Sequence, residues 1–112
     1  MITTSFMKDG IPTVSPKDVL HLKDIRLIDV RMSDEYIGEL GHIEHTQLTT
    51  LGLELETFLK TANKETLIIF VCRSGARSGR ATATALALGF KNVYNMEGGM
   101  LAWNSLGLPI SK

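Results

Sequence analysis

The fold is decided by the stretch from Leu67 to Ser78, which reads Leu67-Ile68-Ile69-Phe70-Val71-Cys72-Arg73-Ser74-Gly75-Ala76-Arg77-Ser78. Its first five residues are apolar, a pattern typical of a central strand that helices cover on both faces of a parallel sheet. From about Arg77 to Leu88 the chain is rich in alanine and compatible with a helix. The stretch therefore predicts a buried strand, a short loop that begins with the only cysteine of the chain, and a helix.

Strand and helix signals alternate on both sides of this stretch. Before it we expect strands at residues 13–14, 26–30 and 46–48, helices that begin near Ser15 and Ser33, and an amphipathic helix around residues 55–62. After it we expect a strand at residues 93–95 and a last helix that begins at Gly98-Gly99 and ends near Gly107. This alternation favours an α/β fold with a mostly parallel sheet and right-handed crossovers.

The size and charge of the chain exclude several classes of protein. Its 112 residues fit one compact domain, which we place at residues 1–112. The 12 basic and 12 acidic side chains cancel, so no charge excess indicates binding to nucleic acid or to a membrane surface. The longest apolar run has six residues, far short of the ~20 that span a bilayer. Because the first twenty residues also lack a signal-peptide core, we expect a cytoplasmic protein.

The cysteine and histidine content argues against a metal site. A lone cysteine cannot form an internal disulfide or a site with several thiolates. The three histidines, His21, His42 and His45, lack the spacing of a helical metal-binding pair. We therefore expect neither a metal nor another cofactor.

Cys72 has the surroundings of an anionic nucleophile. A thiol attacks as its thiolate, and Gly75 lets successive amides of the loop turn inward as an anion nest. The positive end of the following helix and the permanent charges of Arg73 and Arg77 favour the same ionised form. A persulfide on Cys72 would occupy the same ring of donors. The alternative is an inert core cysteine, but such a residue needs neither the glycine nor the arginines.

Four segments of the sequence resemble the rhodanese family of sulfurtransferases. They are Leu27-Ile28-Asp29-Val30-Arg31 with Glu35-Tyr36, Gly41-His42-Ile43, the loop from Cys72 to Ser78, and Gly98-Gly99 with Trp103. Together they span about residues 13–110. The family commonly continues Gly-His-Ile with Pro-Gly-Ala and a second proline, whereas this chain reads Glu44-His45-Thr46-Gln47. We expect a different backbone path there.

The resemblance implies a five-stranded parallel sheet with helices on both faces, and Cys72 as the residue that carries sulfur. It places Arg73 and Arg77 where they bind or neutralise the donor. It also implies that backbone amides surround the persulfide, those of Ser74, Gly75, Ala76, Arg77 and Ser78.

The other matching residues have structural roles in this interpretation. An aspartate at a strand end with an arginine two residues on usually forms a local ion pair, so Asp29, Arg31 and Glu35 are expected to be mainly structural. His42 is expected to fix a loop by hydrogen bonding, and Trp103 to pack in the core or at its rim.

The implied activity is that of a thiosulfate sulfurtransferase. The Cys72 thiolate would take the outer sulfur of a small donor such as thiosulfate, or of a persulfide, and a second nucleophile such as cyanide or a thiol would remove it. Either the donor or the acceptor could be a protein.

Two other functions remain open. The first is a relay or binding module that passes persulfide sulfur between proteins, whose chemistry at Cys72 would be the same. The second is a phosphatase or arsenate reductase. Related phosphatases have five residues between cysteine and arginine, whereas four separate Cys72 from Arg77, and this chain has no resolving cysteine.

Overall fold

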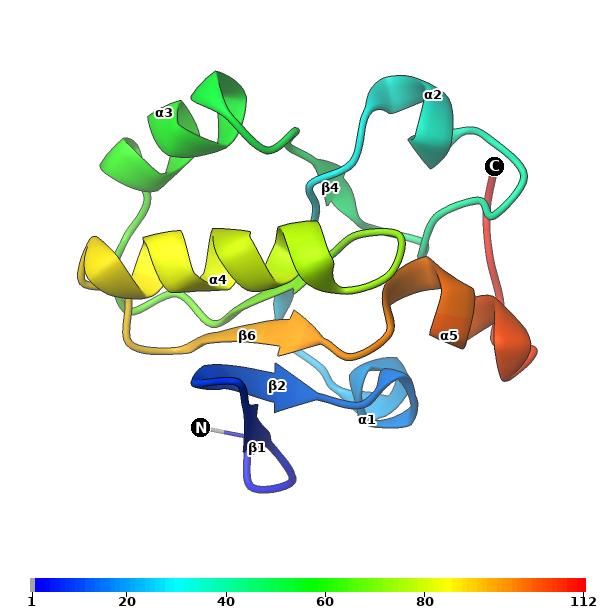
Figure 1. The fold of residues 1–112 in the computed structure, drawn as a ribbon, viewed down its shortest axis with the longest axis horizontal. Coiled ribbons are helices and arrows are strands. Elements are labelled where there is room, and N and C mark those ends of the chain that lie inside the picture. Colours follow the sequence, from blue (N-terminus) through cyan, green and yellow to red (C-terminus); the bar gives the residue numbers. More distant parts are fainter. Residues whose placement is uncertain (1) are drawn as a thin grey trace.

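Figure 1 shows the computed structural model of the chain, which describes residues 2–112. Strands and helices alternate from β2 onward, as the sequence predicts. The elements are β1 (Phe6–Lys8), β2 (Ile11–Val14), α1 (Pro16–His21), β3 (Arg26–Asp29), α2 (Ser33–Tyr36), β4 (Gln47–Leu48), α3 (Leu53–Thr61), β5 (Ile68–Val71), α4 (Ala76–Ala87), β6 (Val93–Met96) and α5 (Gly99–Ser105). Within residues 2–112, no helix has both the length and the apolar character needed to cross a bilayer.

The sheet has six strands in the order β1-β2-β6-β5-β3-β4. The five from β2 to β4 pair in parallel, which confirms the predicted parallel sheet, and β1 adds an antiparallel edge beside β2. β1 is not among the predicted strands. Its signal is the dipeptide Asp9-Gly10, in which both residues have positive φ angles, 51° and 77°. An Asp-Gly pair between two strands is a strong indication of a tight hairpin.

The core is built around β5, the most deeply buried strand. Ile68, Phe70 and then Cys72 pack on the side of α3 and α4, whereas Ile69 and Val71 pack on the opposite side with α1 and α5. All four residues of the strand are completely buried, and full burial of one such side chain contributes roughly 1.5–3 kcal/mol. Burial on both faces explains the unbroken apolar run, and it directs the Cys72 side chain toward α4.

The loop after β3 is held by a buried ion pair. Asp29 and Arg31 are 0% and 1% exposed, and their Oδ2 and Nη2 atoms lie 2.8 Å apart. The guanidinium also donates to the carbonyl oxygens of Gly41 at 2.7 Å and Glu35 at 3.2 Å. The local ion pair expected from the sequence is confirmed, and it joins three segments behind the carboxyl edge of the sheet.

The segment after α2 is held by stacked rings. The centroids of the Tyr36 and His42 rings lie 3.7 Å apart, and the angle between the ring planes is 6°. The His42 Nδ1 atom is 2.8 Å from the Tyr36 carbonyl oxygen. The Tyr36 hydroxyl donates to the Thr46 carbonyl at 2.7 Å, and burial raises the pKa of Tyr36. These contacts confirm His42 as a residue that fixes a loop. In the divergent segment that follows, His45 has a φ of 69°.

Candidate active site

Cys72 is the first residue after β5, at the carboxyl edge of the sheet, where parallel sheets usually bind ligands. Only 1% of its surface is exposed. The Gly75 amide nonetheless donates to its Sγ atom over 3.0 Å, and the Ser78 hydroxyl lies 3.2 Å from the same atom. The sulfur is therefore a hydrogen-bond acceptor that faces the following loop and helix, and it is more than an apolar core side chain.

The loop conformation depends on Gly75, the N-cap of α4. Its φ and ψ angles are 103° and −12°, in a region where a side chain would be strained. A β-carbon at this position would also lie 3.3 Å from the Gly98 amide nitrogen. The left-handed turn directs the Gly75 amide to the sulfur and starts α4 immediately afterwards. The first turn of α4 then adds amides that have no acceptor within the helix, so its positive end lies close to Cys72.

The start of α5 holds the same loop from the other side. The Met100 amide donates to the Cys72 carbonyl at 2.8 Å, and the Leu101 amide donates to the Arg73 carbonyl at 2.9 Å. Gly99 directly precedes these two amides and has a φ of 58°, and a β-carbon there would overlap the carbonyl oxygens of Cys72 and Arg73. Close approach of two backbones is thus the physical reason for the second glycine of the Gly98-Gly99 pair.

Asn95 is a site residue that the sequence did not reveal. It lies on β6, accepts a hydrogen bond from the Ser78 hydroxyl through Oδ1, and donates through Nδ2 to the Gly75 carbonyl at 3.0 Å. The Ser78 hydroxyl has a single hydrogen, so it can donate to Asn95 or to Cys72 but not to both at once. The available signal was a polar side chain in an otherwise buried strand, Val93–Met96.

Arg77 points to a carboxylate rather than to the sulfur. Its two terminal nitrogens bind the two carboxylate oxygens of Glu35 over 2.7 and 2.8 Å. This hydrogen-bonded pair lowers the pKa of Glu35 from 4.5 to about 2 and raises the pKa of Arg77. The pair joins residues 42 positions apart, so no local spacing could have indicated it. A role for Arg77 toward the donor stays a prediction.

The remaining residues of the loop contribute to two surface grooves. Arg73 is exposed and lines a groove of about 440 Å³ together with Asp34, Glu35 and Glu39. Ser74, Gly75 and Ala76 line a second groove of about 410 Å³ with Arg80, Asn95 and Glu97. Of the amides predicted to surround a persulfide, that of Gly75 contacts the sulfur. The others stay predictions.

Trp103 lies away from the loop, in the core on the α1 and α5 side of the sheet. It is 1% exposed, and its indole nitrogen donates to the Pro109 carbonyl at 2.9 Å. The predicted packing role is confirmed.

Comparison with known proteins places this fold and loop in one family. Residues 15–106 match the family model of the rhodanese-like domain. A sulfurtransferase of Allochromatium vinosum is 45% identical over 89 residues, which cover 79% of each chain. The solution structure of a polysulfide-sulfur transferase homodimer from Wolinella succinogenes has a TM-score of 0.70 and 34% identity, and covers 87% of this chain and 75% of that one.

An uncharacterised protein of Synechocystis is 33% identical over 103 residues, which cover 89% of this chain and 56% of that protein. This chain thus spans little more than half the length of that relative. The family match extends over most of the sequence and includes both the Cys72 loop and the glycine pair that holds it. The chain therefore belongs to the family of rhodanese-like domains.

Proposed function

We propose that this protein is a sulfurtransferase that moves a sulfane sulfur from thiosulfate or a persulfide donor to a thiophilic acceptor through a persulfide on Cys72. Its family, together with relatives named as sulfur transferases, supports sulfur transfer as the general reaction. The observation that carries the proposal is the hydrogen bond from the Gly75 amide to the Cys72 sulfur at the start of α4. A hydrogen-bond donor in this position stabilises a Cys72 sulfur that carries negative charge.

The first half-reaction loads the enzyme. The Cys72 thiolate attacks the outer sulfur of the donor, a new S–S bond forms, and the old S–S bond breaks. Sulfite leaves with the bonding electron pair when the donor is thiosulfate, and a thiolate leaves when the donor is a persulfide. The negative charge then lies on the outer sulfur of the Cys72 persulfide, where the positive end of α4 favours it.

The second half-reaction unloads the enzyme. An acceptor thiolate, or cyanide in the test tube, attacks the outer sulfur and forms a bond to it. The bond to Cys72 breaks, and its electrons return to the Cys72 sulfur, which regains the hydrogen bond from Gly75. The two half-reactions give ping-pong kinetics.

The arginines of the loop would act on the donor by charge. Arg73 is exposed beside the loop, and in this proposal it attracts the anionic group of the donor. Arg77 would contribute less than a free guanidinium, because Glu35 occupies both of its terminal nitrogens.

A protein-to-protein persulfide relay is the second candidate for the biological role. The exposed Arg73 and the two open grooves favour it, since they leave room for a partner's surface beside the loop that follows Cys72. We expect the protein to act in the cytoplasm in either case.

Mass spectrometry of the intact protein tests the proposal. After incubation with thiosulfate or with a small alkyl hydropersulfide, we expect the mass to rise by one sulfur and to return to its starting value after cyanide is added. The matched control is Cys72→Ser, which keeps a small polar side chain and should gain no sulfur. Uptake by this variant, or no uptake by the wild-type protein from either donor, would refute the proposal.

A further inference from the structure

We propose that Glu35 selects donors by charge: it cancels the positive charge of Arg77, so the site favours a donor with one negative charge, such as a hydropersulfide anion, over the thiosulfate dianion. This inference rests on the proposed sulfur transfer at Cys72. It assigns a specificity role to a residue that the sequence had marked as mainly structural.

Glu35 and Arg77 form a two-point ion pair. Both carboxylate oxygens of Glu35 bind both terminal nitrogens of Arg77, at 2.7 and 2.8 Å. The Met32 amide donates to the same carboxylate at 3.2 Å, so Glu35 is held from two sides. A planar two-point contact of this kind is the strongest geometry that an arginine and a carboxylate can form. A bound donor would have to share Arg77 with this carboxylate or displace it.

The pair of Glu35 and Arg77 has no net charge at neutral pH. The pKa of Glu35 is lowered to about 2 by its hydrogen bonds with Arg77, and an arginine side chain does not lose its proton in this range. The two charges therefore cancel at any pH at which the protein works. Arg77 cannot count as a full positive charge in the loop.

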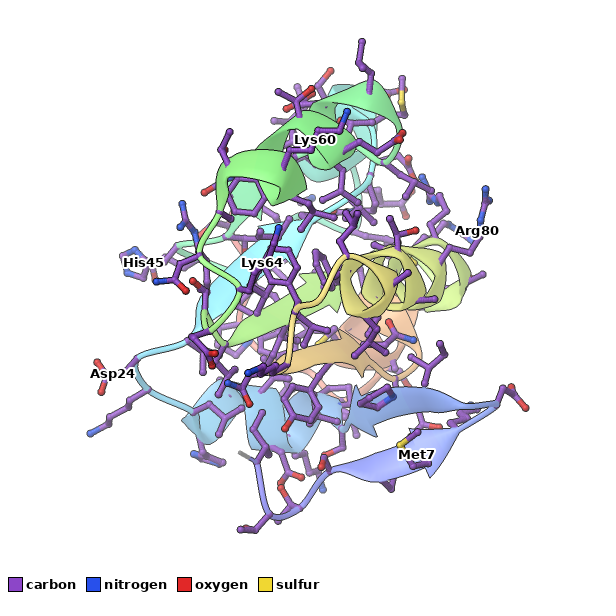
Figure 2. All side chains as sticks on the ribbon, turned by 90° about the vertical axis from the view of Figure 1, so that its left-hand side faces the viewer. Met7, Asp24, His45, Lys60, Lys64 and Arg80 are labelled. Carbon is purple, nitrogen blue, oxygen red and sulfur yellow. The ribbon has the colours of Figure 1, made fainter. Side chains whose placement is uncertain are left out.

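Few other positive charges beside the loop are free of a counter-charge. Arg31 is cancelled by Asp29 in the interior, and Lys8 is paired with Glu97 at 2.9 Å. Within residues 2–112, Arg73 and Arg80 form no ion pair. Figure 2 shows Arg80 extending outward from α4.

The free charges that line the two grooves give no positive excess. Arg73 shares its groove with the carboxylates of Asp34 and Glu39, and Arg80 shares the other with Asp9. The charged side chains that line the two grooves therefore add no net positive charge to the end of α4 that would favour a dianion.

The charge of the donor decides how strongly it responds to this balance. Electrostatic energy is proportional to charge, so removal of the Glu35 carboxylate should help a dianion twice as much, in free energy, as a monoanion. If the gain for thiosulfate is about tenfold, the gain for a singly charged persulfide is about threefold, and the ratio between the two donors shifts by about threefold. A purely structural role for Glu35 would change both donors alike.

The test is the rate at which Cys72 gains a sulfur, measured by intact mass at several donor concentrations in the absence of any acceptor. The variant is Glu35→Gln, which keeps the shape and an acceptor oxygen and removes the charge. The control is Asp34→Asn, which removes the same charge from the same groove without a contact to Arg77. Thermal unfolding of each variant shows whether it is folded.

We expect Glu35→Gln to raise the second-order loading constant for thiosulfate by about tenfold and that for an alkyl hydropersulfide by about threefold, and Asp34→Asn to change the donor ratio less. An unchanged donor ratio in Glu35→Gln would overturn this inference and leave the proposed function intact. If the wild-type protein gains sulfur from neither donor, the proposed function fails and this inference fails with it.

A second measurement uses only the wild-type protein. Salt screens free charges strongly, so a site with an uncancelled Arg77 would lose thiosulfate loading steeply as ionic strength rises. We expect a shallow dependence, because the neutral pair leaves little net charge to screen. A steep decrease with salt would contradict the inference even if Glu35→Gln did not fold.

Discussion

Two arginine–carboxylate pairs lie behind and beside the Cys72 loop, and they differ in burial and in reach along the chain. Asp29 and Arg31 are two residues apart and almost completely buried, with side chains 0% and 1% exposed. Glu35 and Arg77 are 42 residues apart, with side chains 27% and 32% exposed. Loss of one partner from a buried pair leaves a buried charge without a counter-charge, which strongly destabilises the fold. A part-exposed pair adds little to stability. The same chemistry thus supports the fold in one place and sets the charge beside the loop in the other.

The largest expected effect is on stability, from the buried pair. Asp29→Asn leaves the Arg31 guanidinium without its counter-charge in the interior, and we expect it to lower the free energy of unfolding by about 3–5 kcal/mol. Urea unfolding at neutral pH measures this loss. The control Asp34→Asn, at an exposed carboxylate, should stay within about 0.5 kcal/mol of the wild-type protein. Similar values for the two variants would remove the distinction between buried and exposed charges.

An intermediate effect is expected from a contact without net charge. Asn95→Ala removes one of two hydrogen-bond partners of the Ser78 hydroxyl and one of two of the Gly75 carbonyl. Each lost hydrogen bond costs about 0.5–1.5 kcal/mol. Sulfur loading should also slow, because Gly75 and Ser78 both contact the Cys72 sulfur.

The matched control for this prediction is Asn92→Ala. Asn92 also donates to a backbone carbonyl, that of Glu65 at 3.3 Å, but at the surface. Equal losses of stability and of loading rate in the two alanine variants would show that Asn95 has no special relation to the loop.

A smaller effect on stability, with a clear effect on loading, is expected from the part-exposed pair. Arg77→Ala should change the free energy of unfolding by less than about 1 kcal/mol. It leaves the Glu35 carboxylate uncompensated beside the loop, so thiosulfate loading should fall by about tenfold. Arg80→Ala, on the same helix, is the control and should change both quantities less. A large loss of stability in Arg77→Ala would mean that the pair of Glu35 and Arg77 supports the fold as much as the pair of Asp29 and Arg31 does.

The smallest effect is the pH dependence of that pair. The pKa of Glu35 is lowered from 4.5 to about 2, so its stabilising contribution is complete above pH 4.5 and is lost as the pH falls toward 2. Urea unfolding between pH 5 and pH 2 should therefore show the wild-type protein and Glu35→Gln converging in stability at the acid end. Parallel curves over this range would mean that the ion pair adds nothing to stability.

The order of elements was predictable because its signals are local. The apolar run of β5, the Ser15-Pro16 helix start and the glycine pair before α5 each lie within a few residues of the structure that they specify. The Asp9-Gly10 hairpin was equally local, and β1 could have been predicted from it.

The contacts between side chains of the site were less predictable. The contacts of Asn95 with Ser78 and of Glu35 with Arg77 join residues 17 and 42 positions apart. They exist only because parallel strands bring their loops to one edge of the sheet. Residue types indicated a sulfur nucleophile there. They did not indicate that a carboxylate pairs with Arg77 and leaves Arg73 without an ion-pair partner among residues 2–112.

The backbone contact between α5 and the Cys72 loop has a consequence for protein engineering. Two consecutive peptide groups of the loop depend on the first turn of the last helix, so the thiol can be displaced by a change that never touches it. In a deep mutational scan selected for turnover, position 99 should therefore tolerate as few substitutions as position 72, because any added methyl group would push both carbonyls aside. Fusion partners or tags joined after Lys112 need a linker long enough to leave α5 undisturbed.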